Sequence, residues 1–323
     1  MWYLLINKTG GKIMTNEQIL EYIHSDKIKK AIIDGDYAAE IDDQYALTYA
    51  LGAEKIDLLG VNAAAYYEEP NAVDTEAVML EGYEEIKRVL SRIGRLDGSI
   101  PYFEGARSQI TKNENYAPSD SPAARNIIKA SHEVEDILFV LVTGPCTNVV
   151  SACLMDPSIM DKICVIWLGG ECIDETTGPF HEWNLYADYA ASQMLLNLDI
   201  PLILLPCGPI GSVKIVMSHD DFMKIDGEGA GAEFFRRTLP LEEVNETRYN
   251  DPAWRKVMCD LAAPAVLSVP DSMEITVRTS PVMGDDHKYT FDSTRRKIMY
   301  GVKPDSEKIV EDTIKAIKNV LAK

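Results

Sequence analysis

The chain has 323 residues, of which 46% are hydrophobic and 26% are charged, and no low-complexity tract interrupts it. This length and composition suit one large globular domain whose core needs no disulfide or structural metal. The net charge of −19 argues against nucleic acid and anionic membrane surfaces as partners.

The cysteines and the apolar segments of the chain indicate in which cellular compartment the protein is expected. None of the six cysteines forms a Cys-x-x-Cys pair or a zinc-site spacing, which predicts free thiols in a reducing, cytoplasmic setting. No apolar stretch is long enough to span a bilayer, and the apolar residues 1–6 end too soon at Asn7 for a signal-peptide core. We expect residues 1–29 to be an N-terminal extension, loosely attached before the possible alternative start at Met14.

Short apolar runs alternate with longer segments of helical periodicity over the first two thirds of the chain. The runs predict strands at 30–34, 58–63, 137–142, 163–168 and 202–206. The periodic segments predict helices at 42–51, 72–93, 123–132, 147–154 and 187–197. This alternation predicts an α/β fold with a doubly wound, mainly parallel open sheet flanked by helices.

The pattern changes after residue 219. A glycine-rich turn at 226–231 precedes a charged, helix-like stretch to about 239, and a further helix is predicted at 253–267. Short β-like runs follow at 274–278, 288–291 and 297–302, and an amphipathic helix closes the chain. Without repeats or an obvious linker, we expect a single domain over residues 1–323.

The segment 33–44 carries the densest chemistry in the chain. Asp34, Asp36, Glu40, Asp42 and Asp43 follow directly after an apolar run and precede an amphipathic stretch. A strand, an acidic loop and a helix in this order place carboxylates at the carboxyl edge of a sheet, where open α/β folds bind ligands. Such oxygen ligands suit a hard divalent cation, Ca²⁺ or Mg²⁺. The alternatives are a solvated acidic loop and, for Asp42, a helix N-cap.

Asp34-x-Asp36 followed by Asp42-Asp43 resembles the N-terminal signature Asp-x-Asp-Pro-Gly-x-Asp-Asp of the inosine–uridine-preferring nucleoside hydrolase family. Here the turn is two residues longer, lacks Pro-Gly and contains Glu40. Further segments resemble family motifs in the same order: residues 59–61, 101–106, 142–148, 168–170, 182–188 and 259–260. The ordered matches extend from about residue 30 to 270.

This resemblance implies a nucleoside-hydrolase-like domain that uses Ca²⁺ to hydrolyse the N-glycosidic bond of ribonucleosides, releasing base and ribose for purine or pyrimidine salvage. It implies Ca²⁺ ligands at Asp36, Asp43, the Thr143 carbonyl and Asp260, with Asp36 also the general base and Asp34 supporting the metal ligands from behind. It implies ribose contacts from Asp42, Glu182 and Asn184. It also implies a small-molecule nucleoside as the partner and a homodimer or homotetramer.

Some positions depart from the family pattern. Cys259 stands where many members carry a His thought to protonate the leaving base, and a thiol donates a proton less readily than imidazolium. His181 is a candidate to replace that acid. Tyr67 stands where an Asn is common, and Trp183 could stack on a base. Residues from about 219 to 252 are expected to form a lid.

Three other functions fit the sequence less well. A non-catalytic or altered-specificity ribosyl-binding member of the same fold would keep the metal ligands without the usual acid. A phosphotransfer enzyme using Asp34-Gly35-Asp36 fits poorly, because Tyr37-Ala38 follows where such enzymes carry Thr or Val. An EF-hand fails, because the loop lacks Gly at its sixth position and Glu at its twelfth.

Overall fold

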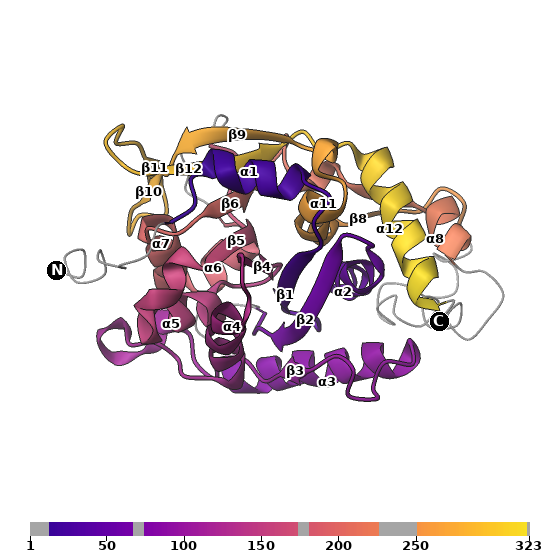
Figure 1. The fold of residues 1–323 in the computed structure, drawn as a ribbon, viewed down its shortest axis with the longest axis horizontal. Helices are drawn as coiled ribbons and strands as arrows, with labels where there is room; N and C mark the ends of the chain where they lie inside the picture. Colours follow the sequence, from indigo (N-terminus) through magenta and orange to yellow (C-terminus); the bar gives the residue numbers. More distant parts are fainter. Residues whose placement is uncertain (1–12, 67–73, 174–180, 226–250, 322–323) are drawn as a thin grey trace.

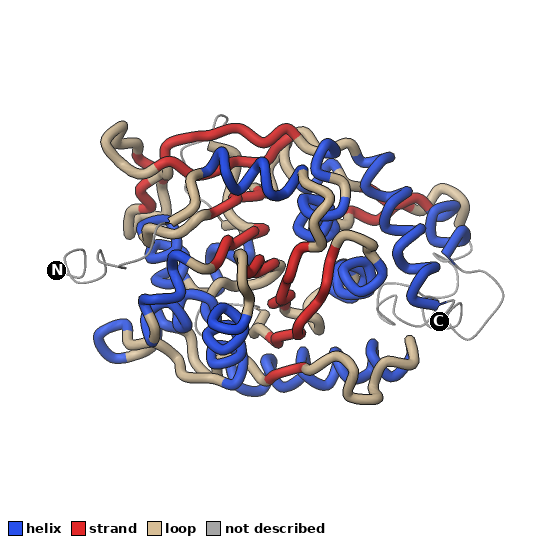
Figure 2. The backbone as a smooth tube through the Cα atoms, viewed as in Figure 1, coloured by secondary structure: helices blue, strands red, loops and turns tan. Residues whose placement is uncertain are grey.

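The computed structural model describes residues 13–66, 74–173, 181–225 and 251–321. An eight-stranded sheet in the order β3-β2-β1-β4-β5-β6-β12-β9 runs through its centre, with helices on both sides (Figures 1 and 2). Its strands are β1 (Lys29–Gly35), β2 (Ile56–Ala63), β3 (Tyr102–Phe103), β4 (Leu138–Val142), β5 (Ile163–Leu168), β6 (Leu202–Leu205), β9 (Glu274–Thr279) and β12 (Lys297–Val302). The five strands expected before residue 210 are confirmed within about two residues.

All neighbouring strands of this sheet pair in parallel except β12 and β9. Strands β4, β5 and β6 are buried along their whole length, which explains their uninterrupted apolar sequences. The chain passes from β1 to β2 and β3 on one side, and then returns to place β4 on the other side of β1. The sheet is therefore mainly parallel, as expected, and its topological switch point lies between β1 and β4.

The two faces of the sheet are covered by different helices, each contributing to one hydrophobic cluster. One face is covered by α1 (Asn16–His24), α2 (Asp42–Gly52), α3 (Thr75–Arg92), α11 (Ala262–Ser268) and α12 (Ser306–Leu321). The other is covered by α4 (Pro122–Glu133), α5 (Thr147–Met155) and α7 (Tyr189–Asn197). In Figure 1 these two groups lie on opposite sides of the strands.

Helix α1 lies within the expected N-terminal extension. The Thr15 side chain caps its first turn and Gln18 completes a capping box. Ile19 and Ile23 are fully buried in the core cluster, so this part of the extension is an integral layer of the fold. Residues 1–12 lie outside the described part.

The prediction of one helix over 253–267 is wrong in its first half. Residues 255–257 form β8 (Arg255–Val257), which pairs antiparallel with β7 (Val216–Ser218). A 3₁₀ turn, η6 (Cys259–Leu261), then leads into α11. The local apolar spacing could not reveal this, because a strand partner 40 residues away decides the conformation.

The helix predicted at 187–197 is α7 (Tyr189–Asn197), which begins two residues later than expected, and the short helix α6 (Trp183–Ala187) precedes it with Asp188 between them. Asp188 is fully buried and caps α7 by accepting from the Ala191 backbone N–H. Its carboxylate also accepts from the backbone N–H groups of Ile110 and Thr111. This tertiary requirement breaks the helix at Asp188.

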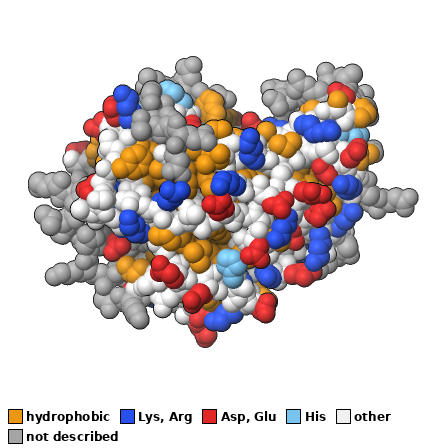
Figure 3. Space-filling model, turned by 90° about the horizontal axis from the view of Figure 1, so that it is seen from above, with side chains coloured by type: hydrophobic (Ala, Val, Ile, Leu, Met, Phe, Trp, Pro, Cys, Tyr) orange, Lys and Arg blue, Asp and Glu red, His pale blue; other side chains and the backbone are white. Residues whose placement is uncertain are grey.

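The remaining elements are peripheral. They are α8 (His219–Ile225), the hairpin of β10 (Val282–Met283) and β11 (Tyr289–Thr290), and the 3₁₀ turns η2 (Ile110–Lys112), η3 (Glu114–Tyr116), η4 (Pro157–Asp161), η5 (Ser212–Lys214) and η7 (Pro270–Ser272). No described helix has the length and apolar character required to cross a membrane. On the face drawn in Figure 3, basic and acidic side chains lie intermixed.

Candidate metal and ribose site

The acidic loop begins where β1 ends. Asp36 directly follows the strand, and Asp42 and Asp43 occupy the first turn of α2. Carboxylates at this end of a helix are favoured by the positive end of its dipole. The N-cap position is Ile41, without a side-chain cap, so the alternative interpretation of Asp42 as an N-cap is wrong.

Three carboxylates from two distant segments form a group suited to a metal ion. One oxygen each from Asp42, Asp43 and Asp260 lies within 4.8 Å of the others, and all three side chains are buried. Asp260 arrives on η6, where its backbone N–H donates to Asp42 Oδ2 at 3.4 Å. Asp36 lines the same cavity but is not one of this trio.

The buried acids of this site carry negative charge that no cation in this group of described residues compensates. Burial first, and then the neighbouring carboxylates, raise the pKa values of Asp43 and Asp260 well above the ordinary range. Burial raises the pKa of Asp36 to about 7, with the charge of Asp42 adding to the effect. Burial and then Glu40 raise the pKa of Asp42 to about 6. A divalent cation would remove this repulsion, so the donor set fits a hard metal ion.

Thr143, at the carboxyl end of β4, connects the acids to the ribose-motif segment. Its hydroxyl donates to Asp43 Oδ1 at 2.7 Å, and its carbonyl accepts from Asn184 Nδ2 at 2.7 Å. The same Asn184 amide nitrogen donates to the Leu168 carbonyl at 3.0 Å. Both N–H groups of Asn184 are therefore used within the protein, which leaves its amide able only to accept from a ligand.

Glu182 is the N-cap of α6 and is buried at the cavity wall. It accepts three backbone N–H bonds, from Gly170, Asn184 and Leu185, at 2.7–3.0 Å. Burial nevertheless raises the pKa of Glu182 to about 7. The short helix and its cap hold Glu182 and Asn184 in fixed positions beside Thr143.

Asp34 lies behind the acidic loop, fully buried on β1. Asn148 Nδ2 donates to one of its oxygens at 3.1 Å and Asn62 Nδ2 to the other at 3.4 Å. The Asn148 side chain also bonds the Ala63 carbonyl and the Ala106 N–H. Helix α5, on which Asn148 lies, has no side-chain cap, and Thr147 Oγ1 in its first turn donates to Asp188.

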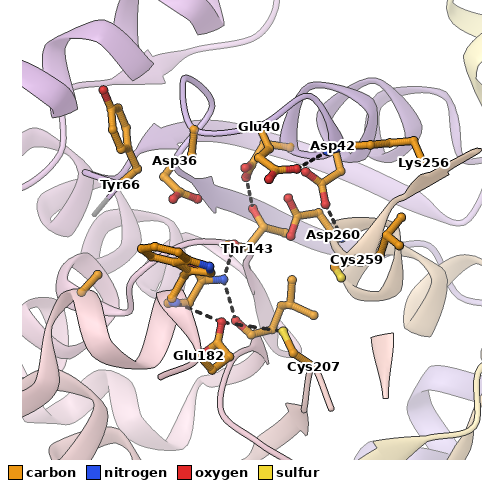
Figure 4. Close-up of a pocket in the computed structure, with 17 residues that line it drawn as sticks. Asp36, Glu40, Asp42, Tyr66, Thr143, Glu182, Cys207, Lys256, Cys259 and Asp260 are labelled. Atoms are coloured by element: carbon orange, nitrogen blue, oxygen red, sulfur yellow. Dashed lines mark hydrogen bonds and ion pairs between the residues drawn. The ribbon is translucent and has the colours of Figure 1, made fainter. Parts of the chain in front are cut away.

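These residues surround a cavity of about 480 Å³ (Figure 4). It is lined by acidic side chains (Asp36, Glu40, Asp42, Asp43, Glu182, Asp260), by polar or sulfur-bearing ones (Thr143, Asn184, Cys207, Cys259, Lys256), by aromatic ones (Tyr66, Trp183) and by the aliphatic Ala39, Leu168, Ala187 and Val257. The structure thus brings together nine of the eleven residues singled out from the sequence for direct roles, with Asp34 directly behind them.

The other two expected residues are placed differently. His181 is exposed and is not among the described residues that line the cavity, so its expected role as leaving-group acid has no support from this geometry. Tyr67 lies outside the described residues, as does most of the expected lid, residues 226–250. Trp183 does line the cavity, with 62% of its surface exposed.

Two features of the cavity were missed by sequence reasoning. Cys207 follows strand β6, and its Sγ lies 3.7 Å from Glu182 Oε1. Its place directly after an apolar strand run was a usable signal. Lys256 on β8 forms an ion pair with Glu40 of the acidic loop. No local pattern marks that pair, because the two residues are 216 positions apart.

Comparison with known proteins agrees with this geometry. The family model described as "Inosine-uridine preferring nucleoside hydrolase" matches residues 31–311. The pyrimidine-specific ribonucleoside hydrolase RihA of Escherichia coli O1:K1 is 23% identical over 184 residues, which is 50% of this chain and 56% of that protein. The chain thus spans about half the length of the curated relatives it matches.

Solved structures show the same fold. The inosine-uridine preferring nucleoside hydrolase from Bacillus anthracis superimposes with a TM-score of 0.65 at 18% identity, covering 90% of this chain and 99% of that one. The purine-preferring ribonucleoside hydrolase from Gardnerella vaginalis gives 0.66 at 17% identity, covering 91% and 100%. The family match covers well over half of the sequence, and the chain belongs to the inosine-uridine preferring nucleoside hydrolase family.

Proposed function

We propose that this chain hydrolyses the N-glycosidic bond of ribonucleosides in a Ca²⁺-dependent reaction. The observation that carries the proposal is the buried trio Asp42, Asp43 and Asp260, facing Glu182 and Asn184 across one cavity at the switch point of the sheet. Oxygen ligands of this kind prefer a hard ion. A bound Ca²⁺ would lower the pKa of a coordinated water and so supply the nucleophile near neutral pH.

The ligand set proposed from the resemblance is Asp36, Asp43, the Thr143 carbonyl and Asp260. The geometry adds Asp42, whose carboxylate lies within the metal-sized group. Asp36 can also take a proton from water as general base, because it lines the cavity beside the metal-sized group. Gly144 permits its position, since a side chain there would begin 2.8 Å from Asp36 Oδ1.

The ribose hydroxyls are proposed to bind Asn184, Glu182 and Asp42. Asn184 can only accept, because its N–H groups are held by Thr143 and Leu168, and a hydroxyl is a donor that matches it. Glu182 and Asp42 present acceptor oxygens when ionised. These contacts would orient the anomeric carbon toward the water that Asp36 deprotonates. By the family resemblance, Cys259 stands in place of the usual His beside the ligand Asp260. The formation of a homo-oligomer stays a prediction.

The test is to incubate the protein with purine and pyrimidine ribonucleosides, with Ca²⁺ and with chelator, and to quantify free base and reducing sugar. Chelator-sensitive release supports the proposal, and Asp260→Asn is expected to abolish it. The matched control Asp271→Asn changes an exposed acid on the surface. Tight ribose binding without turnover would instead favour a non-catalytic ribosyl-binding protein, and chelator-insensitive hydrolysis would contradict the Ca²⁺ mechanism.

A further inference from the structure

The acidic loop and strand β8 meet at the wall of the cavity. The Lys256 ammonium donates to a Glu40 carboxylate oxygen, and both residues line the cavity. The Lys256 side chain is only 17% exposed, whereas that of Glu40 is 61% exposed. Figure 4 shows Lys256 reaching from β8 toward Glu40 and Asp42. Glu40 therefore holds the cation on the cavity side of the loop.

Lys256 differs in charge from the other charged residues that line the cavity. Among the described residues that line the cavity, it is the one Lys or Arg beside six carboxylates, and no His is among them. Glu40 of the acidic loop therefore has its ion-pair partner on β8.

The proposed reaction needs a positive partner of this kind. Water oxygen forms the new bond to the anomeric carbon and gives one proton to Asp36. The electron pair of the broken carbon–nitrogen bond moves onto the base, which becomes negatively charged until it takes a proton from solvent. A cation placed where this charge develops lowers the barrier to bond cleavage. Acceptor atoms on the ring, such as the pyrimidine 2-carbonyl oxygen, can receive an N–H donor.

We propose that Lys256 is a catalytic residue that donates a hydrogen bond from its ammonium group to the departing base, and that Glu40 is a positioning residue that holds it there. This inference rests on the proposed hydrolase function. An ammonium group has three N–H donors, so one bond to Glu40 is compatible with another to the base. Lys256 stays protonated throughout, and the proton balance of the reaction does not pass through it.

The experiment compares two substrates whose leaving groups differ in how much stabilisation they require as they depart. A ribonucleoside that the protein cleaves is one, and p-nitrophenyl ribofuranoside, whose nitrophenolate leaves without assistance, is the other. Lys256→Met is expected to lower kcat/KM about 100-fold for the nucleoside, as loss of an electrostatic stabiliser does, and by less than about 3-fold for the nitrophenyl riboside. Lys256→Arg should restore much of the nucleoside activity, and Glu40→Gln should show a smaller loss of the same selective kind.

The matched control is Lys315→Met, which removes an exposed lysine paired with Glu54, away from the residues that line the cavity, and should leave both substrates unaffected. Equal losses on both substrates for Lys256→Met would assign it a structural role and overturn the inference, as would no loss on either. Wild-type cleavage of the nitrophenyl riboside but of no nucleoside would also overturn it, while leaving hydrolase chemistry intact. A wild-type protein that cleaves neither would reject the proposed function itself. If Lys256→Met does not fold, the losses in kcat/KM of Glu40→Gln and Lys256→Arg on the two substrates are compared instead, and a selective loss on the nucleoside supports the inference.

Discussion

The Thr143 hydroxyl donates a 2.7 Å hydrogen bond to Asp43 Oδ1, joining the end of β4 to the first turn of α2 across the switch point of the sheet. The two residues are 100 positions apart. This bond fixes one oxygen of a buried carboxylate within the group that also contains Asp42 and Asp260. Outer partners of this kind orient metal ligands and tune their affinity.

Replacing Thr143 by Val should weaken Ca²⁺ binding about 10- to 100-fold, because Asp43 loses the donor that orients it. Thr143→Ser keeps the hydroxyl and should bind within about 3-fold of the wild type, as measured by titration calorimetry. Equal affinities for Val and Ser would show that the hydroxyl does not orient the ligand.

Calcium should stabilise the protein more at pH 8 than at pH 5.5. Burial raises the pKa of Asp36 to about 7 and that of Asp42 to about 6, from 3.8. At pH values between 3.8 and these raised pKa values, the folded, metal-free protein binds more protons than the unfolded chain. The metal-free fold therefore loses stability as the pH rises toward about 7. Calcium binds the ionised carboxylates and offsets this loss.

The measurement is the difference in Tm between Ca²⁺ and chelator across that pH range. The difference should grow with pH, and it should vanish at all pH values in Asp260→Asn. A shift that shrinks between pH 5.5 and 8 would mean that these acids do not bind the ion.

Asp36→Asn should lower kcat about 10²- to 10⁴-fold, the usual cost of losing a general base. The metal-free variant should be no less stable than the wild type at pH 8, because it removes a buried negative charge from a cluster of like charges. Steady-state kinetics and thermal unfolding together test this prediction. A kcat equal to that of the wild type would mean that another residue is the general base. A large drop in Tm would assign Asp36 a structural role.

Gly35→Ala should disrupt the site, although it adds a single methyl group. A Cβ at Gly35 would lie 2.4 Å from Asp43 Oδ1 and 2.5 Å from Thr143 Oγ1. Both atoms would have to move, which breaks their hydrogen bond, so Ca²⁺ affinity and Tm should both fall. Gly82→Ala is the control, because its nearest neighbour would be 3.4 Å away and Ala favours the helix. Equal behaviour of the two variants would contradict the close packing.

Much of the fold could be predicted from the sequence. The buried strands β4, β5 and β6 are continuous apolar runs, and α12 carries a helical spacing of apolar residues, so local pattern and final structure agree. Helix α2 differs from the amphipathic stretch expected there, because residues 42–50 are buried on all sides. The cluster Asp36, Asp42 and Asp43 was visible because its members are close in sequence. Their spacing after an apolar run predicted an acidic loop at a strand end, which the structure contains.

The tertiary structure decided what depends on contacts between distant residues. Residues 255–257 form a strand because β7 offers a partner, and Asp188 breaks a helix because it must cap α7 and hold residues 110–111. Lys256 meets Glu40, and Asp260 meets Asp42, only after the chain has folded. The physical reason is that side-chain periodicity records which residues are buried, whereas hydrogen bonds and ion pairs across the fold depend on positions that only the packed sheet and helices define.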